Sequence, residues 1–253
     1  MIEFNSRLLR NRSEWTPDLE PLISFPIATY NRANILFNRT IPSILNQGYS
    51  RLEIIIVGDA ALPEYNIFLD DIDPRVSFYN LRSRSAYPKS PFDLWCVAGY
   101  RPRNIAARLC HGQCHWWISD DDTLEPDAIS EFLQFIRTKP DVESVYANNM
   151  ARGEGGKITI STLATNPAPI SFPITGMPSW INRSYLSKIF RWNGLSFMNE
   201  LNKPSDYDLQ ERMKKHGVIF DYLDKVLAST WGSEEHNWLH GSSLYIYHPD
   251  SYA

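Results

Sequence analysis

The chain has 253 residues, of which 43% are hydrophobic and 21% charged, a balance that permits a sizeable core and argues against wholesale disorder. The net charge of −4 and the pI of about 5.9 argue against a dedicated nucleic-acid binder. No apolar run reaches the ~18 residues of a membrane span, the N-terminus lacks the apolar region of a secretion signal, and three cysteines make no disulfide framework. We therefore expect a cytoplasmic protein with no integral membrane segment and no nucleic-acid partner.

Strand-like and helix-like segments alternate through the first half of the chain. Short apolar runs predict strands at 22–28, 52–57, 76–81 and 115–119. Apolar residues at helical spacing predict helices at 37–45, 62–74, 104–109 and 126–137. Residues 82–102 read as a long surface loop, of a length that is usually functional. This alternation predicts a mostly parallel α/β sheet with helices on both faces.

The pattern changes after residue 140. Strands are predicted at 144–147, 157–160 and 218–222, and a helix at 206–216. Residues 163–183 are rich in proline and apolar side chains, and the tail 231–253 holds three of the six histidines. The second half is therefore expected to be α+β and more irregular than the first.

Three adjacent carboxylates, those of Asp120, Asp121 and Asp122, follow the strand predicted at 115–119. Ligands of open α/β sheets bind beyond the carboxyl ends of the strands. A divalent cation relieves the repulsion among three carboxylates, and oxygen ligands suit Mg²⁺ or Mn²⁺. A metal site for a phosphate-bearing substrate is the favoured interpretation, and a solvated turn that caps the next helix is the alternative.

Thr29, Tyr30 and Asp59 follow two other predicted strands and are expected at the same edge of the sheet as the acidic triplet. Tyr30 could stack on a nucleotide base. Asp59 could accept a hydrogen bond from a base N–H or a ribose hydroxyl. Ordinary turn residues fit the same positions equally well.

Asp206 lies near the start of a predicted helix, where backbone N–H groups favour a carboxylate, so it fits either a catalytic base or a plain N-cap. In the tail, His236 and then His240 could add a nitrogen ligand to a metal held by carboxylates, although surface histidines are the simpler interpretation. Cys110 and Cys114 lack the second ligand pair of a structural zinc site. The absence of a P-loop, a dinucleotide fingerprint and a nucleophile elbow disfavours kinases, dehydrogenases and simple hydrolases.

Four segments in order, 23–32, 53–59, 103–126 and 206–212, resemble the motifs of family 2 glycosyltransferases of the GT-A fold. They match the opening strand and turn, the second strand, the stretch from Arg-Asn to the acidic metal motif and its proline, and the acidic motif of the catalytic base. The resemblance implies one GT-A domain with a Rossmann-like sheet. Residues 21–125 would form its nucleotide-sugar-binding half, 126–230 its acceptor-binding half, and 231–253 a tail that could act as a lid.

The resemblance also implies roles for individual residues. The nucleotide sugar would be bound by Thr29, Tyr30, Arg32, Asp59, Arg103 and Asp120. The metal would be held by Asp121, which lies five residues before Pro126, with Asp122 as a near neighbour and His236 as a further contact. Asp206 would be the catalytic base. The acceptor would be bound by Asp208 and by Trp180, with Trp95 and Trp192 as further stacking candidates.

The implied reaction is an inverting transfer of a sugar from a nucleoside-diphosphate sugar to a hydroxyl of a glycan or other acceptor. UDP-sugars are the commonest donors in the resembling family. Mn²⁺ or Mg²⁺ would hold the diphosphate, and Asp206 would take the proton of the acceptor hydroxyl. A protein of this kind could serve an envelope-glycan pathway through peripheral association with its partners.

Three positions depart from the family pattern: Gly58 and Ser205 stand where an acidic residue is common, and Ser119 takes the first position of the acid-x-acid motif. Gly58 and Ser205 keep open a module that binds a nucleotide sugar without catalysis. A sugar-phosphate nucleotidyltransferase is a second alternative, although residues 29–34 lack the Gly-rich basic loop it would need.

Overall fold

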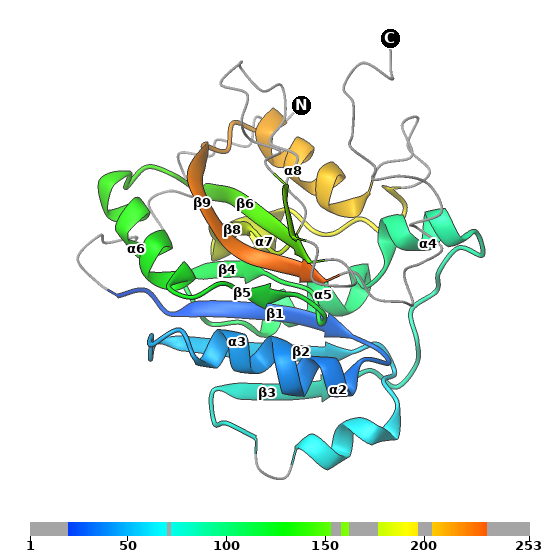
Figure 1. The fold of residues 1–253 in the computed structure, drawn as a ribbon. Helices are drawn as coiled ribbons and strands as arrows, with labels where there is room; N and C mark the ends of the chain where they lie inside the picture. Colours follow the sequence, from blue (N-terminus) through cyan, green and yellow to red (C-terminus); the bar gives the residue numbers. More distant parts are fainter. Residues whose placement is uncertain (1–19, 70–71, 153–157, 162–176, 197–203, 232–253) are drawn as a thin grey trace.

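The computed structural model describes residues 20–69, 72–152, 158–161, 177–196 and 204–231, which fold around one twisted sheet (Figure 1). The strands of these residues run in the order β3-β2-β1-β4-β8-β6-β9-β5, and β7 pairs with β6. The strands are β1 Ile23–Thr29, β2 Leu52–Gly58, β3 Val76–Asn80, β4 Cys114–Trp117, β5 Thr123–Leu124, β6 Ser144–Arg152, β7 Ile158–Ser161, β8 Trp180–Arg183 and β9 Phe220–Trp231.

The helices connect these strands and cover both faces of the sheet (Figure 1). The α-helices are α2 Ala33–Ile35, α3 Ile41–Leu45, α4 Pro91–Val97, α5 Tyr100–Leu109, α6 Ala128–Thr138, α7 Ser184–Ile189 and α8 Ser205–Lys215. A π-helical turn, Leu36–Thr40, joins α2 to α3, and a 3₁₀ helix spans Pro63–Phe68.

The first half of the sheet is parallel, as the alternation of strands and helices predicted. β1 pairs in parallel with β2 and β4, and β2 pairs in parallel with β3. The second half is mixed, because β8 runs antiparallel to both β4 and β6, whereas β9 runs parallel to β6. The predicted fold class, α/β with a more irregular second half, is confirmed.

The apolar run in β2 is continuous because both faces of this strand are covered. Ile54 and Ile56 pack into the large cluster that includes the helices on one face, whereas Ile55 and Val57 pack against Ala106 of α5 on the other. Strands covered on both faces read as unbroken hydrophobic runs rather than alternating ones. A further cluster beneath α7 and α8 is built around tryptophans, which include Trp117, Trp180 and Trp192.

Several elements differ from the sequence expectations. The predicted loop 82–102 contains α4 and the start of α5, because Pro91 and Pro102 both fall within first helical turns, where proline is tolerated. The helix expected over 62–74 is only the short 3₁₀ helix. β9 extends far beyond the expected 218–222, with a register shift opposite Ala147 and Asn148 that is typical of a bulge. In the described part of the chain, no helix has the length and apolarity to cross a membrane.

Candidate active site

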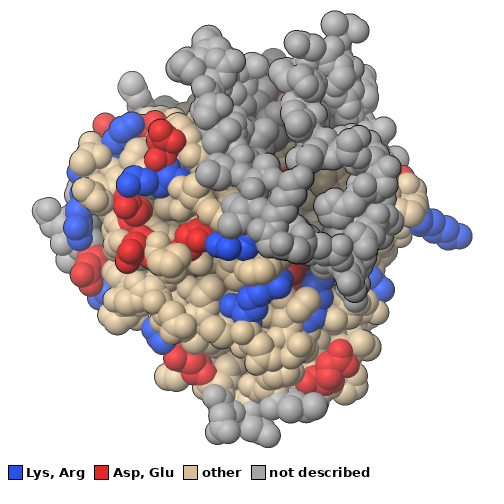
Figure 2. Space-filling view, viewed as in Figure 1, with Lys and Arg blue, Asp and Glu red and all other residues tan. Residues whose placement is uncertain are grey.

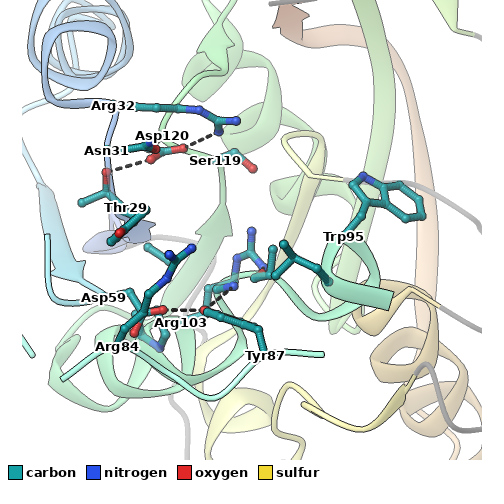
Figure 3. Close-up of a pocket in the computed structure, with 16 residues that line it drawn as sticks. Thr29, Asn31, Arg32, Asp59, Arg84, Tyr87, Trp95, Arg103, Ser119 and Asp120 are labelled. Carbon is teal, nitrogen blue, oxygen red and sulfur yellow. Dashed lines mark hydrogen bonds and ion pairs between the residues drawn. The ribbon is translucent and has the colours of Figure 1, made fainter. Parts of the chain in front are cut away.

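A cavity of about 240 Å³ lies at the carboxyl ends of β1, β2 and β4. Figure 3 shows the side chains around it, which come from the turn after β1, the end of β2, the segment before α5 and the acidic loop after β4. Its polar lining residues are Thr29, Tyr30, Asn31, Arg32, Asp59, Arg84, Tyr87, Arg103, Ser119 and Asp120. The structure therefore places the six residues expected to bind the nucleotide sugar around one cavity.

Thr29 and Arg32 hold the first carboxylate of the acidic loop. Thr29 Oγ1 donates to Asp120 Oδ2 at 2.7 Å, and Arg32 Nη1 donates to Asp120 Oδ1 at 3.1 Å. Tyr65 steadies the same turn, since its hydroxyl accepts from the backbone N–H of Arg32 and bonds Thr29 Oγ1. The end of β1 and the end of β4 are thus joined by side chains at the floor of the cavity (Figure 3).

The backbone of the acidic loop is fixed from the π-helical turn. Thr40 Oγ1 donates to the carbonyl of Asp120 at 3.1 Å, and Arg39 Nη2 donates to the carbonyl of Asp121 at 2.7 Å. π-Helical turns are rare and often lie at functional sites. Here the turn presents consecutive residues, Arg39 and Thr40, to consecutive carbonyl groups.

Trp231, at the end of β9, completes this support. Its Nε1 donates to Thr123 Oγ1 at 3.0 Å, and Arg39 Cζ lies 4.7 Å from its ring centroid. Arg152 contacts the same ring and pairs with Glu125, which lies further along the acidic segment. The ring of Trp231 therefore links the acidic loop to the strand that precedes the tail.

Burial raises the pKa of two of the three carboxyl groups. Burial, together with the neighbouring charge of Asp121, raises the pKa of Asp120 and raises that of Asp122 well above the usual range of a carboxyl group. Arg32 offsets part of this at Asp120. Asp122 faces its own loop instead, where Oδ2 accepts from the backbone N–H of Ser119 at 3.2 Å.

The carboxylate oxygens of the acidic loop are ligands of the kind that bind a divalent cation. Arg32 Nη1 lies 3.1 Å from Asp120 Oδ1 and 3.0 Å from Asp121 Oδ2, so a guanidinium cation stands between two of the three carboxylates of the acidic triplet. Carboxylate oxygens are the ligands that Mg²⁺ and Mn²⁺ prefer. The described residues gather no set of three potential metal-binding side chains, and His236 and His240 lie outside them.

At the other end of the cavity, Arg84 covers Tyr30. The guanidinium carbon of Arg84 lies 3.7 Å from the centroid of the Tyr30 ring. Asp59 is fully engaged by the same segment: Oδ1 accepts from the N–H and the hydroxyl of Ser85, and Oδ2 accepts from the hydroxyl of Tyr87. Burial and the Asp59 carboxylate raise the pKa of Tyr87 to about 12, so its hydroxyl stays protonated and donates.

The surroundings of Gly58 explain why a glycine stands where the resembling family often has an acidic residue. A Cβ atom at this position would lie 2.6 Å from Asn80 Oδ1 and 2.8 Å from Ala61 Cβ. Asn80 uses its amide to close the turn after β2, accepting from the N–H of Ala61 at 2.8 Å and donating to its carbonyl at 3.0 Å. This turn leaves no room for a side chain at Gly58.

Arg103 and Asp206 lie on the side of the site formed by α5 and α8. Burial raises the pKa of Asp206, and the charge of Arg103 offsets part of that rise. The guanidinium of Arg103 stacks over the ring of Trp192, with Cζ 4.9 Å from its centroid, and donates to the carbonyl of Ala98. The carboxylate of Asp206 also accepts from the N–H of Tyr207, which fits its place in the first turn of α8.

The residues expected at the acceptor are packed inside the protein. Trp180 is 0% exposed, stacks on Trp117, and donates from Nε1 to Ser144. Trp192 is also buried. Asp208 is 5% exposed and holds Arg212 of the same helix at 2.9 Å. These placements give Trp180 and Asp208 structural roles, and of the three tryptophans only Trp95 lines the cavity.

Some residues of the site were not singled out by the sequence, among them Arg39, Tyr65, Arg84, Ser85, Tyr87 and Trp231. The unusual length of segment 82–102 was the sequence feature that could have pointed to Arg84, Ser85 and Tyr87 as site residues. No sequence signal pointed to Tyr65, which lies in the 3₁₀ helix. Seen from the side of Figure 1, several Lys and Arg side chains lie near the middle of the face, whereas acidic and basic side chains are intermixed towards its left edge (Figure 2).

The chain is similar in sequence to known glycosyltransferases, although no protein-family model matches it. It is 29% identical over 199 residues to WcaA of Escherichia coli K12, assigned to colanic acid biosynthesis as a glycosyl transferase, over 76% of this chain and 66% of WcaA. It is 25% identical over 216 residues to a chondroitin synthase of Escherichia coli, over 81% of this chain and 28% of the synthase. The chain thus spans less than two thirds of the length of either relative.

Solved structures share the fold. TarS 1–349 of S. aureus in complex with UDP-GlcNAc gives a TM-score of 0.62 at 15% identity, over 84% of this chain and 59% of the TarS 1–349 chain. The mannosyltransferase PcManGT of Pyrobaculum calidifontis, in complex with GDP-Man and Mn²⁺, gives 0.59 at 14% identity, over 92% of this chain and 64% of that one. The predicted GT-A fold and the resemblance to glycosyltransferases are confirmed, and glycosyl transfer is the enzyme class of these relatives.

Proposed function

We propose that this chain is a metal-dependent glycosyltransferase that moves a sugar from a nucleoside-diphosphate sugar, with UDP-sugars favoured, to a hydroxyl of a glycan acceptor. One observation carries the proposal: Thr29 and Arg32 hold the carboxylate of Asp120 at the carboxyl ends of parallel strands. Nucleotides bind at this edge in open α/β sheets. Because the relatives named above are a glycosyl transferase assigned to colanic acid biosynthesis and a chondroitin synthase, we place the activity in polysaccharide assembly.

In this proposal the nucleotide base lies at Tyr30 and Asp59, and the diphosphate lies between Arg32 and Arg103. Both arginines line the cavity, and their positive charge favours an anionic ligand. Drug-sized ligands occupy pockets of about 300–1,000 Å³. The cavity measures about 240 Å³, and Arg84 covers the ring of Tyr30, so a base that stacks on this face of the ring takes the place of the guanidinium.

We assign the metal to Asp121 and Asp120, with Asp122 as a near neighbour and His236 as a further candidate. Arg32 supplies the cation between Asp120 and Asp121 in this structure, which supports the fit of a positive ion at that place. A divalent cation bound there would hold the diphosphate and stabilise the charge on the leaving group. Arg39 and Thr40 would keep the loop backbone in position for it.

Asp206 is our proposed general base. Burial raises its pKa toward the working pH, where a carboxylate is most effective in proton transfer. The acceptor hydroxyl would give its proton to Asp206 while its oxygen bonds to the anomeric carbon. The bond from that carbon to the diphosphate oxygen would break in the same step, so the nucleoside diphosphate leaves and the anomeric configuration inverts.

A thermal-shift panel of UDP, GDP, CDP and dTDP with and without Mn²⁺ tests the proposal. A ligand at about 100 times its Kd stabilises the fold by about 2.7 kcal/mol, which is readily seen as a higher Tm. We expect one nucleotide to give a shift that requires Mn²⁺ and disappears in Asp121→Ala. Asp141→Ala, which removes an exposed carboxylate elsewhere, should keep the shift. If no nucleotide raises the Tm with Mn²⁺ present, the proposal is wrong.

A further inference from the structure

The side chain of Arg103, which lines the cavity, is held by its own surroundings (Figure 3). Its guanidinium carbon lies 4.9 Å from the centroid of the Trp192 ring, and Nη1 donates to the carbonyl of Ala98. Gly99 lies close by, since a Cβ atom at this position would be 3.3 Å from both Cζ and Nη1 of Arg103. The guanidinium is therefore packed between an indole ring and the backbone that precedes α5.

Trp192 is locked to the same helix as Arg103. Asn104, the next residue of α5, accepts from the backbone N–H of Trp192 at 2.9 Å through Oδ1 and donates to its carbonyl at 2.9 Å through Nδ2. The indole packs against Trp117, with ring centroids 5.1 Å apart, and the residue is 3% exposed. One amide side chain thus holds both backbone groups of the residue whose ring supports the guanidinium.

The segment 191–194 bridges two helices. On the side of α8, Arg212 Nη2 donates to the carbonyl of Arg191 at 2.6 Å. On the side of α5, Gly194 lies against the ring of Tyr100, where a Cβ atom would come within 2.6 Å of two ring carbons. The position of the indole is therefore set from both helices and not by its apolar surroundings alone.

The ring of Trp192, rather than its N–H group, makes the contact with Arg103. In the described part of the chain, Nε1 of Trp192 is buried and has no hydrogen-bond partner. A buried N–H without a partner destabilises a fold, so an entirely apolar side chain would fill this space at a lower cost. Among aromatic side chains, indole attracts a cation most strongly. The guanidinium above the ring explains why a tryptophan stands here.

We propose that Trp192 is a positioning residue for Arg103, and that Asn104 clamps the indole beneath the guanidinium. In the proposed function Arg103 binds the diphosphate of the donor. Guanidinium groups bind phosphate oxygens through N–H groups in a fixed planar arrangement, so their orientation matters. A guanidinium that is already held in place loses little freedom when the diphosphate binds, which strengthens binding. This inference rests on the proposed function, because it assigns how one residue of that site is held.

Calorimetric titration with UDP in the presence of Mn²⁺ tests the role of the ring. Trp192→Leu should raise the Kd of UDP about fivefold or more, which corresponds to the loss of a partly desolvated cation–π contact. Trp192→Phe should stay within about twofold of the wild type, because it keeps a ring and removes an N–H group without a partner. Asn104→Ala, which removes the clamp and leaves the indole, should also weaken UDP binding. GDP replaces UDP if the thermal-shift panel selects GDP.

A double-mutant cycle tests whether the effect passes through Arg103. Arg103→Ala should itself raise the Kd of UDP. In the Arg103→Ala background, Trp192→Leu should change this Kd by less than about twofold, because the guanidinium that it supports is gone. Leu186→Ala removes a buried side chain from the same apolar cluster and is the control for loss of packing. It should lower the Tm and leave the Kd of UDP unchanged.

The inference is overturned if Trp192→Leu weakens UDP binding equally with and without the side chain of Arg103, or if Leu186→Ala weakens it as much. If Trp192→Leu does not fold, Asn104→Ala takes its place in the cycle, with the same two outcomes. Failure of the proposed function is a different result, because the wild type would then bind no nucleoside diphosphate with Mn²⁺. If the wild type binds UDP and Arg103→Ala binds it equally well, only the positioning role is removed.

Discussion

Arg84 lies over the ring of Tyr30, with its guanidinium carbon 3.7 Å from the ring centroid. The arginine therefore occupies the surface on which we propose that the nucleotide base stacks. Asp59 maintains this arrangement, because it accepts hydrogen bonds from Ser85 and Tyr87 in the same segment. In our proposal the guanidinium of Arg84 covers the base subsite, and a nucleotide base takes its place on the ring of Tyr30.

Replacing Arg84 with alanine should strengthen the binding of UDP. A cation–π contact of about 0.5–1 kcal/mol would no longer have to be broken, which corresponds to a two- to fivefold lower Kd. Titration calorimetry in the presence of Mn²⁺ measures this. Arg82→Ala, which changes an exposed arginine outside the cavity, serves as the matched control. Weaker binding by Arg84→Ala would contradict the covering role and assign the guanidinium to the bound nucleotide.

Replacing Asp206 with asparagine should abolish most transfer while keeping the donor site. Loss of a general base lowers kcat by about 10²–10⁴-fold. The Mn²⁺-dependent nucleotide shift in Tm should remain, since Asp206 does not line the cavity. Glu211→Gln, on the same helix and paired with Lys215, is the control. Unchanged kcat in Asp206→Asn would exclude this carboxylate as the base, and a wild type without any transfer would support a nucleotide-sugar-binding module.

The raised pKa of Asp206 also has a consequence for stability. The folded state favours its protonated form, so the favourable contribution of this carboxyl is present at low pH and lost as the pH rises through the folded pKa. Asp206→Asn, which cannot ionise, should therefore have a higher Tm than the wild type at neutral pH, and the difference should shrink on acidification. On acidification, the transfer rate of the wild type should begin to fall at a pH above the usual pKa range of a carboxyl group. A Tm advantage that grows on acidification would contradict this account.

Gly58→Ala should destabilise the fold. The new Cβ would meet Asn80 Oδ1 at 2.6 Å and Ala61 Cβ at 2.8 Å. Overpacking of this kind costs about 1–3 kcal/mol in the free energy of unfolding, measurable by urea denaturation. In an Asn80→Ala background the same substitution should cost less, because one of the two contacts is gone. Equal costs in the two backgrounds would exclude Asn80 as the reason for glycine.

His115 should make the protein less stable in mild acid. Burial lowers the pKa of its imidazole to about 3, so its full contribution to stability holds above its ordinary pKa of 6.5 and is lost as the pH falls toward 3. One proton contributes at most about 1.4 kcal/mol per pH unit. His115→Phe should therefore lose less stability than the wild type between these limits in urea titrations at several pH values. His216→Gln, at an exposed histidine, should follow the wild type.

The sequence predicted the parallel half of the sheet well because its two central strands, β1 and β2, are buried on both faces. In β2 an unbroken apolar run spans Ile54 to Val57, and both faces of the strand are covered. β9 was underestimated because its middle carries Asp224 and Lys225, which lie exposed where the register shifts. Its length depends on pairing with β6 rather than on its own composition. The helix α4 was missed because proline was read as a sign of a loop.

The candidate site was predictable where residues with functional side chains directly follow a strand. Thr29, Asp59 and Asp120 end or follow strands, and parallel pairing brings them to one edge. The partners of these residues were not predictable. That Asp59 is engaged by Ser85 and Tyr87 depends on the path of a segment without periodicity. The burial of Trp180 depends on strand β8, for which a proline-rich stretch gave no register.

The contacts of Trp231 set a limit for shortening the chain. A polypeptide that ends at residue 230 lacks the ring that Arg39 and Arg152 contact, and leaves Thr123 Oγ1 without the indole N–H. Arg39 in turn donates to the carbonyl of Asp121. Removal of Trp231 would therefore weaken the support of the acidic loop, although the two are more than 100 residues apart in the sequence. A polypeptide that ends at residue 231 keeps all of these contacts. Residue 231 is therefore the innermost C-terminal boundary at which a minimal version of this domain retains the support of its acidic loop.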